Sequence, residues 1–189
     1  YEQLFYRFLS RCQAPMGEKR KFRFKNKLFS LDATTIDLCL SLFDWAKFKT
    51  TKGAVKLHLL LDHEGYLPVF AHITEGRVHE VKVAPTLFFP AGSIVVMDRG
   101  YNDYELFGRW TAEGVWFVTR QKGNADFKVI ERRVVPQNRN ILKDELISFE
   151  GYYSKKKCPS VLRRIEVWDE ENEKVIVLLT NHLAFGATT

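Results

Sequence analysis

The run SIVVMDRGYNDYELFGRWTAEGVWFVT, residues 93–119, has the pattern of an open α/β sheet. It begins with a short apolar run, 93–97, of the kind that forms a central strand covered on both faces. Asn102 is the expected N-cap of a helix that ends near Gly114, because Asn favours helix starts and glycine favours helix ends. A second apolar run, 115–119, predicts the next strand. A strand, a helix and a strand in this order predict an α/β fold.

Three more strands are predicted on the N-terminal side of this run. Apolar and β-branched residues favour strands at 28–36, 55–62 and 66–73. The last two are joined by a tight turn in which Gly65 is expected to take a positive φ. The segment 79–89 is predicted to be helical, although it contains a proline. The chain up to residue 119 therefore alternates strands and helices in a mixed layout.

The pattern changes after about residue 123. From 126 to 181 strands predominate and no helix is predicted. The segments 161–168 and 174–180 are expected to pair around the acidic turn 169–172. This part of the chain is interpreted as a β-rich insertion.

The N-terminal part combines a predicted helix, 1–12, with a basic segment, 18–27. Cations and phenylalanines alternate in the basic segment, which predicts an extended stretch with one cationic face. Such a face could lie along a phosphate backbone, or it could be a solvated edge strand whose charges prevent aggregation. Its six cations are Lys19, Arg20, Lys21, Arg23, Lys25 and Lys27.

Composition sets the outer limits on function. The chain has 189 residues, and 46% of them are hydrophobic, which excludes disorder as the main state; no apolar run is long enough to cross a membrane. The charge of +6 is modest evidence for an anionic partner. Cys12, Cys39 and Cys158 have no metal-ligand or disulfide spacing, so they are expected to be buried free thiols in a reducing cytoplasm.

Two carboxylates have positions that suggest chemistry. Asp32 lies within the first predicted strand of the sheet, and Asp98 follows the apolar run 93–97. Burying an unpaired charge is costly, and sites in open α/β sheets form at the carboxyl ends of strands. Two such carboxylates could hold divalent cations, which prefer oxygen ligands. The alternative for either residue alone is a helix cap or a turn former.

The residues around these carboxylates resemble the DDE transposases of bacterial insertion sequences, most closely the insertion-sequence-four group. The resemblance rests on Asp32-Ala33-Thr34-Thr35, on Lys56-Leu57-His58 and on Asp98-Arg99-Gly100-Tyr101. The stretch from Leu31 to Pro68 is similar to that group along nearly its whole length, and the resemblance as a whole covers about residues 32–181.

The resemblance implies a ribonuclease H-like α/β fold, in which a mixed sheet carries a β-rich insertion before the last catalytic helix. It divides the chain into an N-terminal helix and basic segment, 1–27, and an incomplete catalytic core, 28–123. The β-strand insertion then covers 124–182, and 183–189 is a linker towards a catalytic helix outside the chain.

The resemblance also implies a mechanism. Asp32 and Asp98 are two members of an acidic triad that holds two Mg²⁺ (or Mn²⁺) ions, with which the family hydrolyses DNA strands at transposon ends and joins the freed 3′-OH to a target. The third member is a Glu in the pattern Y-x2-R-x3-E-x6-K, which is absent here. Glu166, Glu171 and Glu173 are assigned to a hairpin with a solvated tip instead, and the chain is expected to be inactive alone.

Five further residues are candidates to support the site or to contact DNA: Lys56, His58, Arg99, Gly100 and Tyr101. His58 could equally be a structural histidine, and Arg99 could merely form an ion pair. The implied partners are double-stranded DNA, at transposon ends and target, and a second copy of the protein. The implied location is the bacterial cytoplasm, with no membrane partner.

Two other functions are weighed. The chain could be a decayed or domesticated transposase that only binds DNA or a partner, through the basic segments 19–27, 132–133, 155–157 and 163–164. It could also be a metal-dependent hydrolase with His and Asp ligands. The histidines that favour the second alternative are His58, His63, His72 and His79, which lie beside Asp62 and Glu64.

Overall fold

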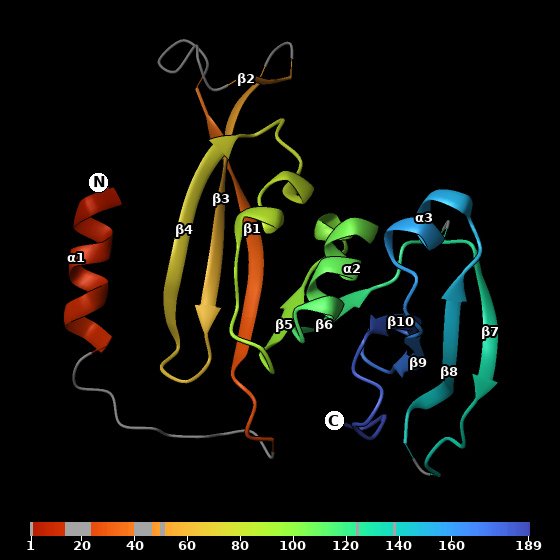
Figure 1. Ribbon diagram of the computed structural model, residues 1–189. Helices are drawn as coiled ribbons and strands as arrows, with labels where there is room; N and C mark the ends of the chain where they lie inside the picture. The colour runs from red at the N-terminus through yellow and green to blue at the C-terminus, as the bar shows by residue number, and fades with distance from the viewer. Residues whose placement is uncertain (1, 14–23, 40–46, 50–51, 124, 138) are drawn as a thin grey trace. The chain divides into compact units, whose positions relative to one another are not determined.

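The computed structural model divides the chain into two compact units, Tyr1–Phe88 and Phe89–Thr189 (Figure 1). Both units contain strands together with helical segments, so the α/β class predicted from the sequence is confirmed. The structure describes residues 2–13, 24–39, 47–49, 52–123, 125–137 and 139–189.

The first unit is built on an antiparallel sheet with β3 (Lys52–Asp62) at its centre. β1 (Leu28–Leu38) pairs with one edge of β3 and β4 (Leu67–Glu75) with the other, as Figure 1 shows. β2 (Lys47–Lys49) is an additional short strand that pairs with the beginning of β3. The three strands predicted for this part of the chain are confirmed.

Side chains of β1 and β3 alternate between the two faces of this sheet. Leu31 pairs with Leu60, and both are buried. Asp32, the next residue of β1, pairs with Leu59 and therefore points to the opposite face, where it is exposed. The register thus places Leu31 and Leu60 on one face of the sheet and Asp32 on the other.

The turn between β3 and β4 is held by Asp62. The Asp62 carboxylate accepts a hydrogen bond from the Glu64 amide at 2.9 Å and forms an ion pair with Lys27 at 3.2 Å. The left-handed residue of this turn is Tyr66, with a φ of 53°. The prediction that Gly65 takes this conformation is wrong, because the turn extends one residue further along the chain.

Two short 3-10 helices, η1 (Glu80–Lys82) and η2 (Ala84–Thr86), replace the single helix predicted over 79–89. Pro85 lies in the first turn of η2. Because proline has no amide hydrogen, it cannot continue the hydrogen bonding of a helix that begins before it. The segment therefore forms two turns in succession.

The second unit begins with two parallel strands, β5 (Ile94–Met97) and β6 (Trp116–Arg120), joined by α2 (Tyr104–Ala112). This strand–helix–strand unit is the one predicted from residues 93–119. The N-cap of α2 is Asp103, whose carboxylate accepts a hydrogen bond from the Leu106 amide at 2.9 Å. The prediction that Asn102 caps the helix is wrong by one residue.

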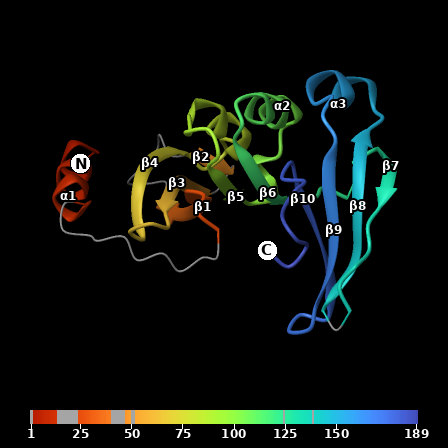
Figure 2. The same ribbon diagram turned by 60° about the horizontal axis from the view of Figure 1, so that its bottom comes forward.

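Four antiparallel strands follow and join the same sheet through β6. The strand order within this unit is β5-β6-β10-β9-β8-β7, and Figure 2 shows the last four side by side. Antiparallel strands in the first unit and a parallel strand–helix–strand unit in the second are consistent with a ribonuclease H-like fold, here with a β-rich insertion. The four strands are β7 (Phe127–Arg132), β8 (Ile141–Phe149), β9 (Leu162–Asp169) and β10 (Lys174–Thr180).

The β-rich part also contains a short helix, α3 (Tyr152–Lys157), so the prediction of no helix between 126 and 181 is wrong. A six-residue helix is too short to show a helical repeat of apolar residues. Its position is set by packing against α2, where Gly108 lies directly against the carbonyl of Lys157. A side chain at position 108 would occupy the space that this carbonyl fills.

The predicted N-terminal helix is confirmed as α1 (Glu2–Gln13). Among its apolar side chains Leu9 is buried, whereas Leu4 and Phe8 are 52% and 56% exposed. The described helices include none that is long and apolar enough to span a membrane.

The three cysteines are free thiols, but only Cys158 is buried. Burial raises the pKa of its thiol to about 11. Cys12 and Cys39 are exposed, so the expectation that all three thiols are buried is wrong for these two. Both lie at the ends of described segments, outside the sheet cores.

Candidate active site

Asp98 follows β5 directly and organises the turn that comes after it. Its Oδ1 accepts a hydrogen bond from the Gly100 amide at 3.0 Å, and its carbonyl accepts one from the Tyr101 amide at 3.1 Å. These bonds close η3 (Arg99–Tyr101), a single 3-10 turn. The carboxylate is exposed, so the premise of a buried charge is wrong for Asp98. What the turn supplies instead is a carboxylate whose orientation is fixed through one oxygen.

The other residues of this motif have different environments. Gly100 contributes its amide to the Asp98 carboxylate, and Arg99 is exposed. Tyr101 is only 1% exposed. A side chain this deeply buried anchors the turn and cannot reach a DNA backbone, so the prediction of a DNA contact is wrong for Tyr101.

Asp32 lies in the middle of β1 on the exposed face of the first sheet. Its Oδ1 accepts a hydrogen bond from the Ala33 amide at 2.8 Å. Among the residues that the structure describes, no Lys, Arg or His lies within ion-pair distance of Asp32 or Asp98. Asp32 in the first unit and Asp98 in the second are thus exposed carboxylates, each with an oxygen left for a cation from outside.

Lys56 and His58 lie on the face of the first sheet opposite to Asp32. β1 and β3 do pair, but Lys56 pairs with Thr35 and His58 with Ala33, and both partners lie an odd number of residues from Asp32 along β1. The expectation that both side chains lie near Asp32 is therefore wrong, because a shift of one residue moves a side chain to the other face.

Both of these side chains have partners within the first unit. Lys56 Nζ lies 2.7 Å from Glu80 Oε1 and donates a hydrogen bond to the Val78 carbonyl at 2.8 Å. Burial tends to raise the pKa of Glu80, but the hydrogen bond and charge of Lys56 outweigh it and leave that pKa lowered. His58 is fully buried, 3.1 Å from the Thr74 hydroxyl, and burial lowers the pKa of its imidazole. These contacts match the structural role weighed for His58.

The basic N-terminal segment is described only from residue 24. Lys25 is exposed, whereas Lys27 pairs with Asp62 at 3.2 Å and lies 5.5 Å from the centre of the Phe29 ring. Four of its six cations lie outside the described residues, namely Lys19, Arg20, Lys21 and Arg23.

Arg163 and Arg164 of the insertion point inward to carboxylates. Arg163, 3% exposed, donates from Nε and Nη2 to the two oxygens of Asp144 at 2.7 and 2.5 Å. Arg164 lies 3.0 Å from Glu145 and 2.6 Å from Glu166. The interpretation of segment 163–164 as a DNA-binding surface is wrong, because these charges are already paired inside the fold.

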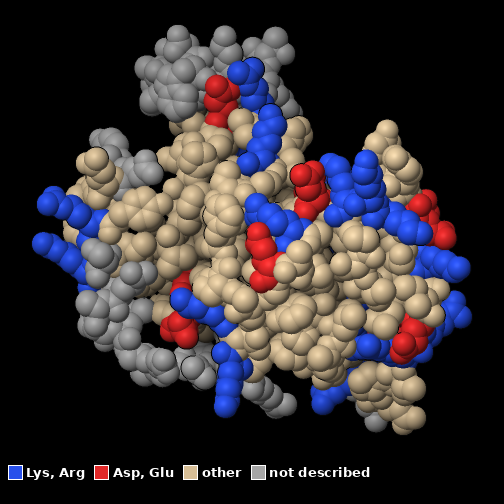
Figure 3. Space-filling view, viewed as in Figure 1, with Lys and Arg blue, Asp and Glu red and all other residues tan. Residues whose placement is uncertain are grey.

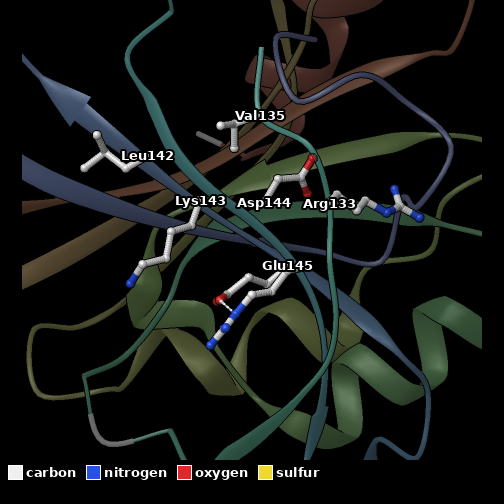
Figure 4. A pocket seen from close by; sticks show the side chains of 7 residues that line it. Arg133, Val135, Leu142, Lys143, Asp144 and Glu145 are labelled. Carbon is white, nitrogen blue, oxygen red and sulfur yellow. Dashed lines mark ion pairs between the residues drawn. The ribbon is translucent and has the colours of Figure 1, made fainter. Parts of the chain in front are cut away.

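A hollow of about 370 Å³ lies beside these pairs, between β7 and β8. Figure 4 shows the Asp144 carboxyl on one side of β8 and the side chains of Lys143 and Glu145 on the other. Glu145 forms an ion pair with Arg132 at 3.5 Å, and Arg133 donates a hydrogen bond to the Leu183 carbonyl at 2.7 Å. Lys143 pairs with Glu166 and Asp144 with Arg163, so the charged side chains around this hollow all have partners within the fold.

The three glutamates set aside as catalytic acids do lie in or beside the β9–β10 hairpin. Glu171 and Glu173 belong to its exposed turn. Glu166 lies within β9, between Lys143 and Arg164, so a solvated tip is wrong for this residue. Burial tends to raise the pKa of Glu166, but its hydrogen bonds with both cations lower it overall.

The histidines take separate partners. His63 lies 2.7 Å from the Ser30 hydroxyl, and the rings of His58 and His72 are 6.4 Å apart. Within the described ranges no three His, Cys, Asp or Glu side chains gather in a way that could hold a metal ion. Neither a histidine-rich zinc site nor a complete acidic triad is formed by the described residues alone.

Asn102, four residues after Asp98, makes polar contacts that the sequence pattern did not reveal, because Asn102 has the signature of a helix cap. Its Oδ1 accepts a hydrogen bond from the Thr119 hydroxyl at 2.7 Å, and its Nδ2 donates to the Arg120 carbonyl at 2.8 Å. These bonds tie the segment after η3 to the end of β6. They fix the chain that leads away from Asp98.

Curated relatives of this chain carry transposase names. A transposase of Sinorhizobium fredii is 29% identical over 158 residues, which cover 80% of this chain and 43% of the relative. The transposase of an insertion sequence element from Geobacillus stearothermophilus is 27% identical over 191 residues, which cover 100% of this chain and 49% of the relative. The chain thus spans about half the length of these relatives.

The chain is also similar to a solved structure, that of the NurA nuclease from Sulfolobus solfataricus. The superposition covers 95% of this chain and 77% of the nuclease, with 9% identity and a TM-score of 0.36. A likeness at this level shows no shared activity.

A family model also matches most of the chain. Residues 23–182 match the model described as the transposase DDE domain. The matched range contains Asp32, Asp98 and all ten strands that the structure describes. The chain belongs to the transposase DDE domain family.

Proposed function

We propose that the chain forms most of the catalytic core of an insertion-sequence transposase that cuts DNA at transposon ends and joins them to a target. The observation that carries the proposal is that the family match includes two exposed carboxylates, Asp32 and Asp98, each with an oxygen that no described residue occupies. Residues 28–123 would provide the core, 124–182 the insertion, 1–27 a DNA-binding arm and 183–189 a linker.

Asp32 and Asp98 fit as ligands of Mg²⁺ or Mn²⁺. Hard divalent cations prefer carboxylate oxygens, and two bound ions would activate the attacking oxygen and stabilise the leaving oxygen of a phosphodiester. Backbone amides hold one oxygen of each carboxylate in place, so the other oxygen is pre-oriented. Arg99, exposed beside Asp98, would contact the DNA phosphates.

The proposal extends to a third ligand and to partners. Because no group of three acidic, His or Cys side chains gathers in the part of the chain that the structure describes, we infer that another carboxylate completes the set. Transposon-end and target DNA would be the substrates, and two copies of the protein would act together on paired ends. The site of action would be the bacterial cytoplasm.

Metal binding tests the ligand assignment without requiring activity. When Mn²⁺ is titrated into isotope-labelled protein, paramagnetic broadening should be strongest at the amides of Ala33 and Gly100, which bond to the two carboxylates. Asp98→Asn should weaken the broadening at both amides, because the amide oxygen keeps the turn but loses the charge.

The matched control for this experiment is Asp169→Asn, since Asp169 is also a partly exposed carboxylate that accepts hydrogen bonds in a turn. This variant should leave the broadening at Ala33 and Gly100 unchanged. If broadening at Ala33 is the same in Asp98→Asn as in the parent protein, the two carboxylates do not share ions and the assignment fails.

We further expect that this 189-residue chain alone will not cleave transposon-end DNA in the presence of Mg²⁺. Two carboxylates position the ions poorly, and the third ligand is missing from the described residues. A gel assay with labelled end DNA checks this expectation. Robust cleavage that is lost in Asp98→Asn would mean that the chain holds a complete triad.

A further inference from the structure

We infer that α3 presents a contact surface for a DNA strand with unpaired bases. The surface, called the α3 platform, consists of Tyr152, Tyr153, Lys155 and Lys156. The inference rests on the proposed function in one respect, namely that DNA is the substrate. The inference goes beyond the proposed function because it names where on the fold the DNA binds and which form of DNA is bound.

Two aromatic rings form the apolar part of the α3 platform. Tyr152 and Tyr153 are 73% and 75% exposed, and their ring centres lie 5.3 Å apart in an edge-to-face arrangement. Adjacent large aromatic side chains are usually covered in a folded domain, because each offers a large apolar area. Exposed ring faces are what the bases of a single strand stack on.

The charged part of the α3 platform differs from the other basic segments of the second unit. Lys155 and Lys156 are exposed, and in the described part of the chain no carboxylate lies within ion-pair distance of either. By contrast, Arg163 and Arg164 are paired with buried acids. Figure 3 shows Lys and Arg side chains gathered over the region where Figure 1 places α3. Two unpaired ammonium groups can therefore bind phosphates.

The α3 platform is also held in place. The opposite side of α3 is anchored by Ser154, which is buried and donates a hydrogen bond to the Gly151 carbonyl at 2.9 Å. The Cys158 amide closes the helix on the Ser154 carbonyl at 2.8 Å, and the Lys157 carbonyl packs against Gly108 of α2. A short helix fixed in this way presents its rings and charges with little ordering cost on binding.

The combination favours unpaired bases over a duplex. Bases in a duplex are already stacked, so they offer edges and not faces to a protein. Lysines alone would bind phosphates of either form. The two rings add base-stacking energy that only a single strand can gain. The α3 platform should therefore prefer single-stranded DNA.

Fluorescence anisotropy on the full chain tests this preference, with a labelled single strand and a hairpin duplex of the same sequence as probes. Tyr152→Ala with Tyr153→Ala should weaken single-strand binding about tenfold or more, because each stacked base contributes substantially. The same pair should change duplex binding by less than about twofold. Tyr152→Phe with Tyr153→Phe keeps both rings and should bind like the parent protein.

The salt dependence of single-strand binding measures the contribution of the lysines separately. For single strands the slope of log K against log salt is about 0.7 per phosphate contacted, so Lys155→Gln with Lys156→Gln should reduce that slope by about 1.4. The matched control is Lys128→Gln with Lys174→Gln, which removes two exposed charges from strands of the same unit. The control pair should leave the slope closer to that of the parent protein.

Three outcomes would overturn the inference: an unchanged single-strand Kd in the alanine pair, an equal loss for both probes, or a change in self-association without a change in DNA binding. The last would make α3 a protein interface. The proposed function is tested separately, because the α3 variants should not alter Mn²⁺ broadening at Gly100. If the parent chain binds neither probe, DNA is not its substrate, and both the proposed function and this inference fail.

Discussion

Asp144→Ala is expected to destabilise the second unit by about 3–5 kcal/mol. Asp144 and Arg163 are 3% and 4% exposed at their side chains, and two parallel hydrogen bonds join them. Removal of the carboxylate leaves a guanidinium group buried without its counter-charge. Because arginine does not release its proton in a protein, it cannot become neutral to relieve this cost.

Urea unfolding followed by tryptophan fluorescence measures this effect. Three of the four tryptophans, Trp110, Trp116 and Trp168, belong to the second unit. Glu171→Ala removes the same charge from the exposed turn and should change stability by less than about 0.5 kcal/mol.

A double variant separates the lost pair from a general packing defect. Asp144→Leu with Arg163→Met replaces both charges by apolar groups and should recover most of the loss, because a buried ion pair contributes little net stability. Recovery should be incomplete, since Arg163 also donates from Nη1 to the Phe185 carbonyl. An Asp144→Ala protein within about 1 kcal/mol of the parent would contradict the buried pair.

Gly108→Ala is the second variant for which we expect a large effect on stability. Here the change in the free energy of unfolding should have the opposite sign to that usually seen for this substitution in a helix. Alanine in place of glycine inside a helix normally stabilises it by about 1 kcal/mol. At position 108 a methyl group would overlap the carbonyl of Lys157, which is backbone and cannot rotate away. We therefore expect a net loss of about 1–3 kcal/mol as α3 is pushed off α2.

Gly123→Ala is the control, because no heavy atom lies within 4 Å of a methyl group added there. It should leave stability nearly unchanged. Hydrogen exchange would localise the effect of Gly108→Ala to the amides of Lys155 and Cys158, which close α3. If hydrogen exchange became faster to the same extent across the whole unit, or if the variant were more stable than the parent protein, α2 and α3 would not be in close contact.

Hydrophobic periodicity was sufficient to predict the long elements of the fold. Strands such as Lys174–Thr180 and the pair around α2 are apolar runs whose length and alternation identify them locally. α3 escaped prediction because its six residues depend on packing against α2 rather than on their own pattern. The N-cap of α2 was misplaced by one residue, since Asn102 and Asp103 are both good caps.

The candidate site was predictable only in part. Asp32 and Asp98 were identified by their motifs, and their roles as ligands stay predictions. The side of the sheet on which Lys56 and His58 lie depends on pairing register, which a strand's own sequence does not state. Asp144 and Glu145, which pair with Arg163 and Arg164, lie on another strand, so this pairing was equally invisible in the sequence.

The pairing of β1 with β3 has a consequence for how this gene region can change. Because Leu31 faces the core and Asp32 faces outward, loss or gain of a single codon within β1 would invert every later side chain of that strand. A change before Leu31 would turn the Asp32 carboxylate inward and Leu31 outward at once. Changes of two codons would preserve the alternation. We expect natural length variants of this strand to differ from one another by an even number of residues.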